Sequence, residues 1–389
     1  MGPVAGVRAG CQSHRTGVKQ EVESVPLSGP YLGEREEELV LEVLRSGRLS
    51  LGPTIDRFEE LLAERVGAPY AAAVSSGTTG LHLLCVAAGI GPGDEVITSP
   101  YSFAASANCF LYEGGTPVFA DIDPRTLNLD PAAVGAAITE RTKAIVAVDI
   151  YGYPCELDEL RALADRHGLA LIGDSCEALG AEYHGAPLGS HGVSCVFAFY
   201  PNKQLTTGEG GMVVTHSEDE WHLIRSLRNQ GRPEPGGWLE HVRLGFNYRL
   251  SDVAAALGIG QIERLDEILA LRGQAAQRYG ELLGAIDGIE LPCDDDEAHT
   301  RSWFVYAVLF PDSVARERTI AAFEREGIGY NRYLPSIHLQ PYMVERFGFE
   351  EGLCPVAEDV SSRSLALPFF TGIEAGAQER VAEVLASAL

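Results

Sequence analysis

Positive charge is scarce in this sequence. Its 389 residues include 30 Lys and Arg against 55 Asp and Glu, which gives a formal net charge of −25 at pH 7. Such a charge repels nucleic-acid phosphates and anionic lipid head groups, so the composition argues against binding to nucleic acids or membrane surfaces. It does not exclude a small anionic ligand, because backbone N–H groups and a few local cations can hold one in a pocket.

The sequence also lacks paired cysteines, long apolar runs and any clustering of metal-binding residue types. Its 8 cysteines are scattered without a C-x-x-C motif, which argues against a zinc site and a disulfide framework. No apolar run approaches the roughly 18 residues that span a bilayer, and residues 1–20 lack the apolar core of a signal peptide. The acidic run 294–297 has no His or carboxylate at ligand spacing, so we interpret it as a solvated loop and expect no metal. We therefore expect a cytoplasmic protein with residues 1–24 as a disordered lead-in.

Lysine is the rarest basic residue and occurs only at Lys19, Lys143 and Lys203. Lys19 lies in the polar lead-in and Lys143 in a charged stretch before a predicted strand, so both are interpreted as surface charges. Lys203 follows the apolar run 193–200 and precedes the glycine-rich stretch 208–211. A lysine near the interior is costly unless its charge is lost or it is neutralised covalently, as in an imine, and Lys203 is therefore a candidate functional amine.

The chain is too long for one compact core, so we expect two domains. The pattern of apolar runs predicts an α/β fold. Short β-branched runs alternate with helical stretches, which is typical of a mostly parallel sheet with helices on both faces. We expect seven strands, at residues 71–75, 95–99, 117–121, 144–150, 169–173, 194–199 and 211–215. The predicted units are a large domain at 25–250, a long linking helix at 251–283 and a smaller α+β C-terminal domain at 284–389.

Three candidate binding elements fall at the C-terminal ends of predicted strands, where α/β folds place their ligands. The turn 74–80 leads into a helix whose free N–H groups suit a phosphate, although Ser and Thr also cap helices that bind nothing. Asp174 ends an apolar strand, where a carboxylate must be paired, functional or a helix cap. With Lys203, these elements match the needs of pyridoxal phosphate: N–H groups for its phosphate, an amine for its aldehyde and a carboxylate for its pyridinium nitrogen. Phe103 could stack on the ring or belong to the ordinary core.

The sequence resembles the DegT/StrS-type sugar aminotransferases, which are fold-type I pyridoxal-phosphate enzymes. The most specific similarity is the stretch 199–211, Phe-Tyr-Pro-Asn-Lys-Gln-Leu-Thr-Thr-Gly-Glu-Gly-Gly, and the resemblance runs from Pro26 to Pro368. Further blocks similar to the family lie at residues 74–82, 91–96, 244–249 and 338–341.

The resemblance implies a role for each matching residue around the cofactor. Lys203 would form the internal aldimine and later move a proton between the α-carbon and C4′ of the cofactor. Asp174 would bind the pyridine nitrogen. The phosphate would be held at Gly77, Thr78 and Thr79.

Other family positions are implied in the same way, with two departures from the usual pattern. Phe103 would stack on the ring, and Asn247 would reach the phosphate from a second subunit. Glu177 stands where the family usually has Gln beside the ring hydroxyl. Ala198 replaces a serine that commonly donates to the phosphate, so one hydrogen bond must be absent or supplied by a backbone group or water.

The implied function is transfer of an amino group from glutamate or glutamine to a nucleotide-linked keto sugar by a homodimer with shared active sites. One alternative keeps the cofactor but uses a keto-cyclitol or another non-nucleotide carbonyl, which a pocket poor in basic residues would favour. A second alternative is a catalytically silent sensor or regulator with the same fold, which the presence of both Lys203 and Asp174 disfavours. Lys203 also disfavours a related dehydratase subgroup that carries histidine there. The sugar, its keto position and the new stereocentre depend on loops such as 230–243 and 331–338.

Overall fold

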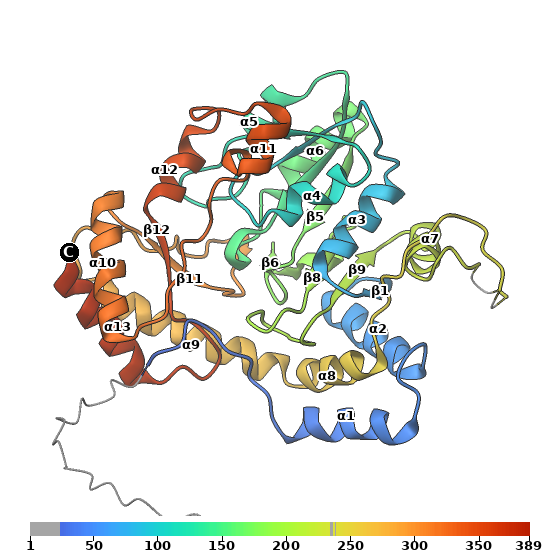
Figure 1. The fold of residues 1–389 in the computed structure, drawn as a ribbon, viewed down its shortest axis with the longest axis horizontal. Coiled ribbons are helices and arrows are strands. Elements are labelled where there is room, and N and C mark those ends of the chain that lie inside the picture. Colours follow the sequence, from blue (N-terminus) through green and yellow to red (C-terminus); the bar gives the residue numbers. More distant parts are fainter. Residues whose placement is uncertain (1–23, 234–235, 238) are drawn as a thin grey trace, which may run out of the picture.

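The computed structural model describes residues 24–389 except 234, 235 and 238, so the predicted lead-in lies outside the described residues apart from Ser24. A seven-stranded sheet forms its centre (Figure 1). The strands are β1 (Tyr70–Val74), β2 (Glu95–Thr98), β3 (Thr116–Phe119), β4 (Thr142–Val148), β5 (Ala170–Asp174), β8 (Ser194–Ala198) and β9 (Gly211–Thr215), in the order β1-β9-β8-β5-β4-β2-β3. Only β9 runs antiparallel to its neighbours in this sheet. The predicted mostly parallel seven-stranded sheet is confirmed.

Both faces of this sheet are buried under helices. Side chains of β4 alternate between two cores: Val146 and Val148 belong to one, and Ile145 and Ala147 to the other. A strand covered on both sides must be apolar at every position, which explains why these strands read as continuous apolar runs. The covering helices of the large part are α2 (Pro53–Val66), α3 (Gly77–Ala87), α4 (Ala105–Leu111), α5 (Pro131–Ala137), α6 (Leu157–His167), α7 (Glu218–Arg228) and α8 (Asp252–Glu263), with α1 (Glu34–Ser46) packed on α8.

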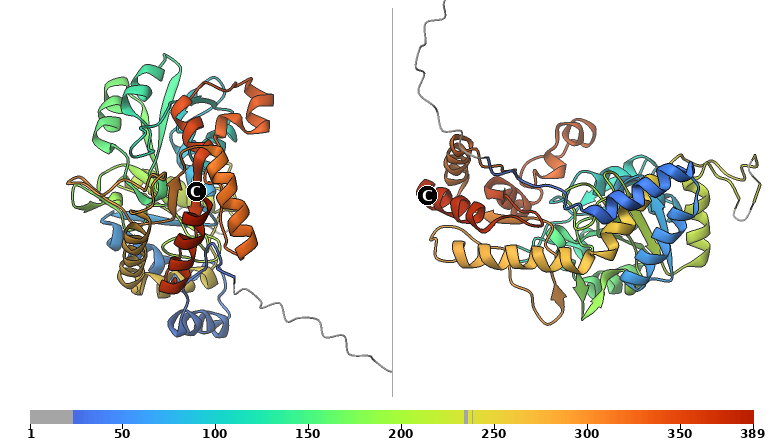
Figure 2. Two further views of the ribbon diagram at one scale, coloured as in Figure 1. Left: turned by 90° about the vertical axis from the view of Figure 1, so that its left-hand side faces the viewer. Right: turned by 90° about the horizontal axis from the view of Figure 1, so that it is seen from below.

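A third core lies in the C-terminal part of the chain, to one side of the main sheet (Figure 2). Its elements are α9 (Leu265–Leu283), β11 (Tyr306–Leu309), α10 (Ser313–Glu326), β12 (Ser364–Leu367) and α13 (Ala375–Ala388). The helices α11 (Pro341–Phe347) and α12 (Pro355–Arg363) instead pack on the large part, where Met343, Ala357 and Val360 join one of the two cores of the main sheet. Val25 joins this core and forms a bridge with Ile328, so the start of the described chain packs on the C-terminal part. The predicted domain limits at 250 and 284 stay a prediction.

The single linking helix predicted over 251–283 is wrong. The chain forms two helices, α8 and α9, which are separated at Arg264. Arg264 has φ −113° and ψ 9°, outside helical values, and its N–H bonds to the carbonyl three residues earlier, at Gln261 (3.2 Å). Asp266 and Glu267 then begin α9 with the acidic first turn that favours a helix N-terminus. The acidic pair was a signal in the sequence for a new helix start. It was overlooked because the apolar periodicity continues on both sides of it.

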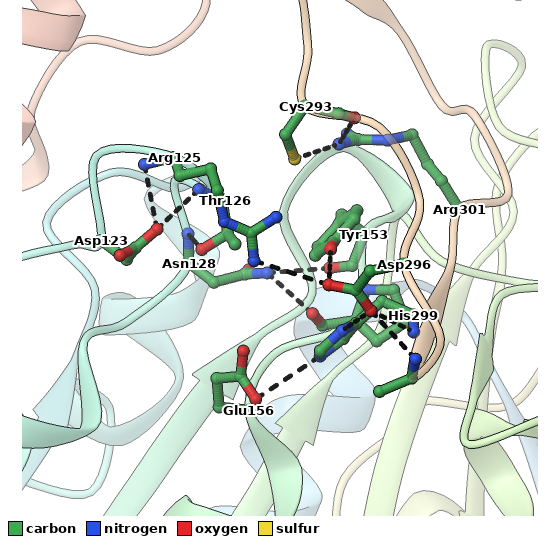
Figure 3. A network of polar contacts seen from close by, with 12 residues as sticks. Asp123, Arg125, Thr126, Asn128, Tyr153, Glu156, Cys293, Asp296, His299 and Arg301 are labelled. Carbon is green, nitrogen blue, oxygen red and sulfur yellow. Dashed lines mark hydrogen bonds and ion pairs between the residues drawn. The ribbon is translucent and has the colours of Figure 1, made fainter.

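One segment of the C-terminal part returns to the large part and pairs with it. The short strand β10 (His299–Thr300) adds to β6 (Glu182–Tyr183), which pairs in turn with β7 (Ala186–Pro187). A polar network reinforces this contact: Asp296 accepts hydrogen bonds from the hydroxyl of Tyr153 (3.1 Å) and the backbone N–H of His299 (3.0 Å) (Figure 3). The acidic run 294–297 is therefore partly engaged in structure rather than simply solvated. Within the described residues no cluster of His, Cys, Asp and Glu could hold a metal ion.

Seven cysteines fall in the described part of the chain, and all seven are free. Cys11 lies outside it. Among residues 24–389, less the three that are not described, no helix combines the length and apolar character that a membrane crossing needs. The cytoplasmic location stays a prediction.

Candidate active site

A cavity of about 490 Å³ opens beyond the C-terminal ends of β4, β5 and β8. This volume is in the range typical of small-molecule and cofactor sites. Six of the predicted site residues line the cavity, namely Gly77, Thr78, Phe103, Asp174, Glu177 and Lys203. The lining does not include the other two, Thr79 and Asn247.

The N-terminus of α3 forms one wall of the cavity. Ser76 and Thr79 bond reciprocally there: Ser76 Oγ accepts the N–H of Thr79 (3.2 Å), and Thr79 Oγ1 accepts the N–H of Ser76 (3.1 Å). The Thr79 hydroxyl is thus used as a cap, and its contact with a phosphate stays a prediction. Gly77 and Thr78 occupy the first turn, where N–H groups have no acceptor within the helix. A Cβ atom on Gly77 would lie 2.8 Å from the side chain of Ala198, so only glycine lets the helix start approach β8 this closely.

Asp174 lies at the end of β5 with its carboxylate facing the cavity wall and only 5% of the residue exposed. Its Oδ2 accepts a hydrogen bond from the hydroxyl of Ser106 (2.6 Å), and its Oδ1 accepts the N–H of Cys176 (3.3 Å). No helix begins at Asp174, so the helix-cap interpretation of this residue is wrong. A buried carboxylate with two donors and no cation bonded to it is suited to bind a cationic ring nitrogen.

Lys203 lines the same cavity and pairs with Glu177. Lys203 Nζ lies 3.4 Å from Glu177 Oε1, and the lysine side chain is 12% exposed. Glu177 Oε2 accepts the N–H of Tyr151 (3.0 Å). Burial raises the pKa of the Glu177 carboxyl, and the nearby Lys203 ammonium opposes that shift. Lys143, by contrast, is exposed on β4, which confirms its interpretation as a surface charge.

Phe103 and Asn247 are both exposed. Phe103 lines the cavity with 66% of its surface accessible, so it is not ordinary core and is free to lie against a ligand. Asn247 forms a backbone bridge with Asn229 on the outside of the large part. It is therefore available to a second subunit, and its reach into a partner's site stays a prediction.

Sequence reasoning missed several residues that shape this cavity. Ser106 bonds to Asp174 from α4, and Asn202 and Phe304 line the cavity beside Lys203. Asn202 Oδ1 is buried without a hydrogen-bond partner, so it is an acceptor that a ligand or water can satisfy. Ser106 gave no signal, because a serine in a helix is common. The position of Asn202 beside the candidate lysine could have identified it.

A second buried carboxylate, Asp149, was also missed and follows β4 next to Asp174. Its Oδ2 accepts the hydroxyl of Ser175 (2.6 Å), its Oδ1 accepts the N–H of Cys155 (2.9 Å), and its own N–H donates to the carbonyl of Asp174 (3.1 Å). Burial raises the pKa of the Asp149 carboxyl to about 6. Asp149 therefore holds the turn that presents Asp174.

We expect the stability that Asp149 contributes to fall as the pH rises. Its folded pKa lies above the value of roughly 3.9 in an unfolded chain, so its contribution is present in full below pH 4 and is lost as the pH rises through about 6. The neutral variant Asp149→Asn should therefore gain about 1 kcal/mol relative to the wild type between pH 5 and pH 7. Urea unfolding at the two pH values and one protein concentration measures this difference. The exposed control Asp287→Asn should show no such change, and an equal change in both variants would contradict the assignment.

The cavity residues fit pyridoxal phosphate. The α3 N-terminus can hold its phosphate, Asp174 can bind its ring nitrogen and Lys203 is the amine within reach. When bound, the cofactor supplies an electron sink for the reacting carbon of the substrate. The side chain of Ala198 lies close to the helix start and offers no hydroxyl there, so the hydrogen bond that a serine would donate to the phosphate must be absent or supplied by a backbone group or water.

Comparisons with known proteins agree with this geometry. The profile of the DegT/DnrJ/EryC1/StrS aminotransferase family matches residues 30–386. The spore coat polysaccharide biosynthesis protein SpsC of Bacillus subtilis is 39% identical over 360 residues, covering 89% of this chain and 92% of SpsC. GDP-perosamine synthase of Caulobacter vibrioides is 39% identical over 321 residues, covering 82% of this chain and 86% of that protein.

Solved structures give the same result for the fold. DesV of S. venezuelae superimposes with a TM-score of 0.86 at 33% identity, covering 90% of this chain and 93% of DesV. The PLP form of the sugar aminotransferase Spr1654 of Streptococcus pneumoniae has a TM-score of 0.89 at 26% identity, covering 94% of this chain and 98% of that chain. These matches confirm the predicted fold-type I architecture. The chain belongs to the DegT/DnrJ/EryC1/StrS aminotransferase family and is a pyridoxal-phosphate-dependent aminotransferase.

Proposed function

We propose that this enzyme transfers an amino group from glutamate or glutamine to a keto sugar linked to a nucleotide. The observation that carries the proposal is the convergence of Lys203, Asp174 and the α3 N-terminus on one cavity. A relative named for a GDP-linked amino sugar supports the nucleotide-linked substrate, and a relative named for polysaccharide biosynthesis supports a sugar.

The proposed chemistry assigns a separate task to each buried group. The amine of Lys203 takes a proton from the reacting carbon of the substrate and returns one, because it is the only amine among the described residues that line the cavity. Asp174, oriented by Ser106, stabilises positive charge on the ring nitrogen. Glu177 balances the lysine ammonium when the amine is free.

A non-nucleotide carbonyl substrate is the second candidate function, and one observation favours it. Among the described residues, Lys203 is the only basic side chain in the cavity lining, which also contains the carboxylates of Asp174, Glu177 and Glu209. A diphosphate would be repelled by these groups unless cations came from elsewhere, such as a second subunit. A keto-cyclitol needs no such cations.

A substrate panel separates the two candidates. The enzyme is first loaded with amino groups by glutamate and then mixed with nucleotide-linked keto sugars or with a keto-cyclitol. The absorbance of the aldehyde form of the cofactor returns only with a competent acceptor. Recovery with the nucleotide-linked sugars at micromolar concentration supports the proposal, whereas recovery with the cyclitol alone would replace it.

The proposal also includes a homodimer in which Asn247 completes the phosphate site of the other subunit. Mixing the inactive variants Lys203→Ala and Asn247→Asp should restore activity, because both defects can fall in one site of a mixed dimer and leave the other site intact. In Asn247→Asp the added carboxylate repels the phosphate. About half of the sites in a mixed dimer should then be active. Subunit exchange is verified by mass spectrometry of the mixed species, and exchange without recovery would contradict a shared site.

A further inference from the structure

The free amine of Lys203 lies over an aromatic ring. Its Nζ is 3.6 Å from the centroid of the Phe304 ring and 3.4 Å from Glu177 Oε1. Phe304 is only 3% exposed, and the lysine side chain is nearly as well shielded. An ammonium at this distance from a ring face is attracted by the ring quadrupole, and the attraction grows as water is removed.

Glu177 alone does not account for the stability of a charged lysine at this position. Its carboxylate is itself buried, and burial raises the pKa of Glu177, which weakens it as a permanent anion. One of its oxygens is already occupied by the N–H of Tyr151 (3.0 Å). The ring of Phe304 therefore supplies a second contact to the ammonium that does not depend on the protonation of a neighbour.

The position of Phe304 relative to Lys203 is fixed by the fully buried Arg272 on α9. Its guanidinium donates to the carbonyls of Trp303 (2.7 Å) and Phe304 (2.6 Å). The same group donates to the carbonyl of Asn202 (3.4 Å), the residue before Lys203. Arg272 is 2% exposed, and burial lowers its pKa to about 10, so it keeps its charge and all of these bonds at neutral pH.

Gln204 makes the corresponding connection on the other side of Lys203. Its side-chain amide donates to the hydroxyl of Ser302 (2.9 Å) and to the backbone carbonyl of Glu177 (2.5 Å). The segment carrying Phe304 is thus tied to the residues before and after the lysine, and Gln204 also holds the backbone of Glu177, whose carboxylate pairs with the lysine. Hydrogen bonds on both sides of Lys203 therefore fix the lysine segment relative to the segment of Phe304, and this gives the free amine a defined resting position.

We propose that Phe304 is a positioning residue for Lys203: the face of its ring holds the lysine ammonium against the cavity wall, opposite Glu177, whenever the amine is not bonded to another group. The proposal rests on the proposed catalytic role of Lys203. Phe304 acts by stabilising the charged, unreactive form of the amine in a defined place, so it controls how readily the amine becomes a nucleophile.

The scarcity of lysine allows a direct test on the full-length protein without cofactor. An amine-acylating reagent is added at pH 7.5, and the rate at Lys203 is measured by peptide mass spectrometry with the exposed Lys143 as internal reference. In Phe304→Leu the Lys203 rate should rise about fivefold, the factor expected when a cation–π contact of roughly 1 kcal/mol is lost. Phe304→Tyr keeps the ring face and should react at the wild-type rate.

Alkylation of Cys176 by neutral iodoacetamide provides the control for access, because this thiol lines the same cavity. Its rate should not rise in either variant, because the Lys203 ammonium lowers the pKa of this thiol and a smaller charge on Lys203 could only slow the alkylation. The proposal is overturned if Lys203 reacts at the wild-type rate in Phe304→Leu, if Phe304→Tyr accelerates the reaction equally, or if Cys176 accelerates in parallel. Because this experiment contains no cofactor, a result that contradicts the role of Phe304 would not contradict the proposed function. Failure of the proposed function would instead appear as cofactor that does not become attached to Lys203.

Discussion

Replacement of Lys203 by alanine should abolish amino transfer while leaving the fold intact. The amine is the only lysine in the described cavity lining, and both covalent attachment of the cofactor and the proton shift require it. We expect the turnover number to fall by at least about a thousandfold, since no other titratable nitrogen in the lining can replace it. Steady-state assay with glutamate and a competent keto acceptor measures the loss, and circular dichroism reports the fold.

Lys143→Ala is the matched control, because Lys143 is exposed on β4 and should be dispensable. The account requires normal activity from this variant. Comparable turnover by Lys203→Ala would mean that Lys143 or Lys19 provides the amine, and the assignment of the cavity would be wrong.

Asp174→Asn should affect the chemical step far more than cofactor binding. The amide keeps the size of the side chain and one acceptor oxygen, which can take the hydrogen bond of either Ser106 or Cys176, but it cannot neutralise a protonated ring nitrogen. Cofactor affinity should weaken by no more than about tenfold, whereas the turnover number should fall about a hundredfold or more. Fluorescence titration with pyridoxal phosphate and single-turnover kinetics measure the two effects separately.

Ser106→Ala is the control for this experiment because it removes a donor to Asp174 and leaves the carboxylate in place. Its effect on turnover should be much smaller than that of Asp174→Asn. If Asp174→Asn kept an unchanged turnover number, Asp174 would serve only to hold the turn after β5.

The sequence predicts the central sheet well because its strands are buried on both faces. The run 144–148 has no polar position, and the strand β4 differs from the predicted strand 144–150 only at its ends. Asp174 and Lys203 were singled out because a charged group next to an apolar run is costly unless it has a partner, and both residues line the cavity.

The features that could not be predicted from the sequence depend on contacts between distant parts of the chain. Phe304 looks like an ordinary apolar residue in a strand, and its contact with Lys203 arises only because the segment around β10 folds back onto the large part. Arg272 likewise lies in an unremarkable helical stretch, and its role depends on three carbonyls that come from elsewhere in the chain. A local sequence pattern indicates which residues are buried, but it does not indicate which distant residues they contact.

Fixation of the cofactor by reduction tests the central claim most directly. The protein is loaded with one equivalent of pyridoxal phosphate, treated with borohydride, digested and analysed by mass spectrometry. The account predicts stoichiometric label on the peptide that contains Lys203, with Lys143 labelled only at a large excess of cofactor. Label confined to Lys143 or Lys19, or no stable label on a folded protein, would contradict it.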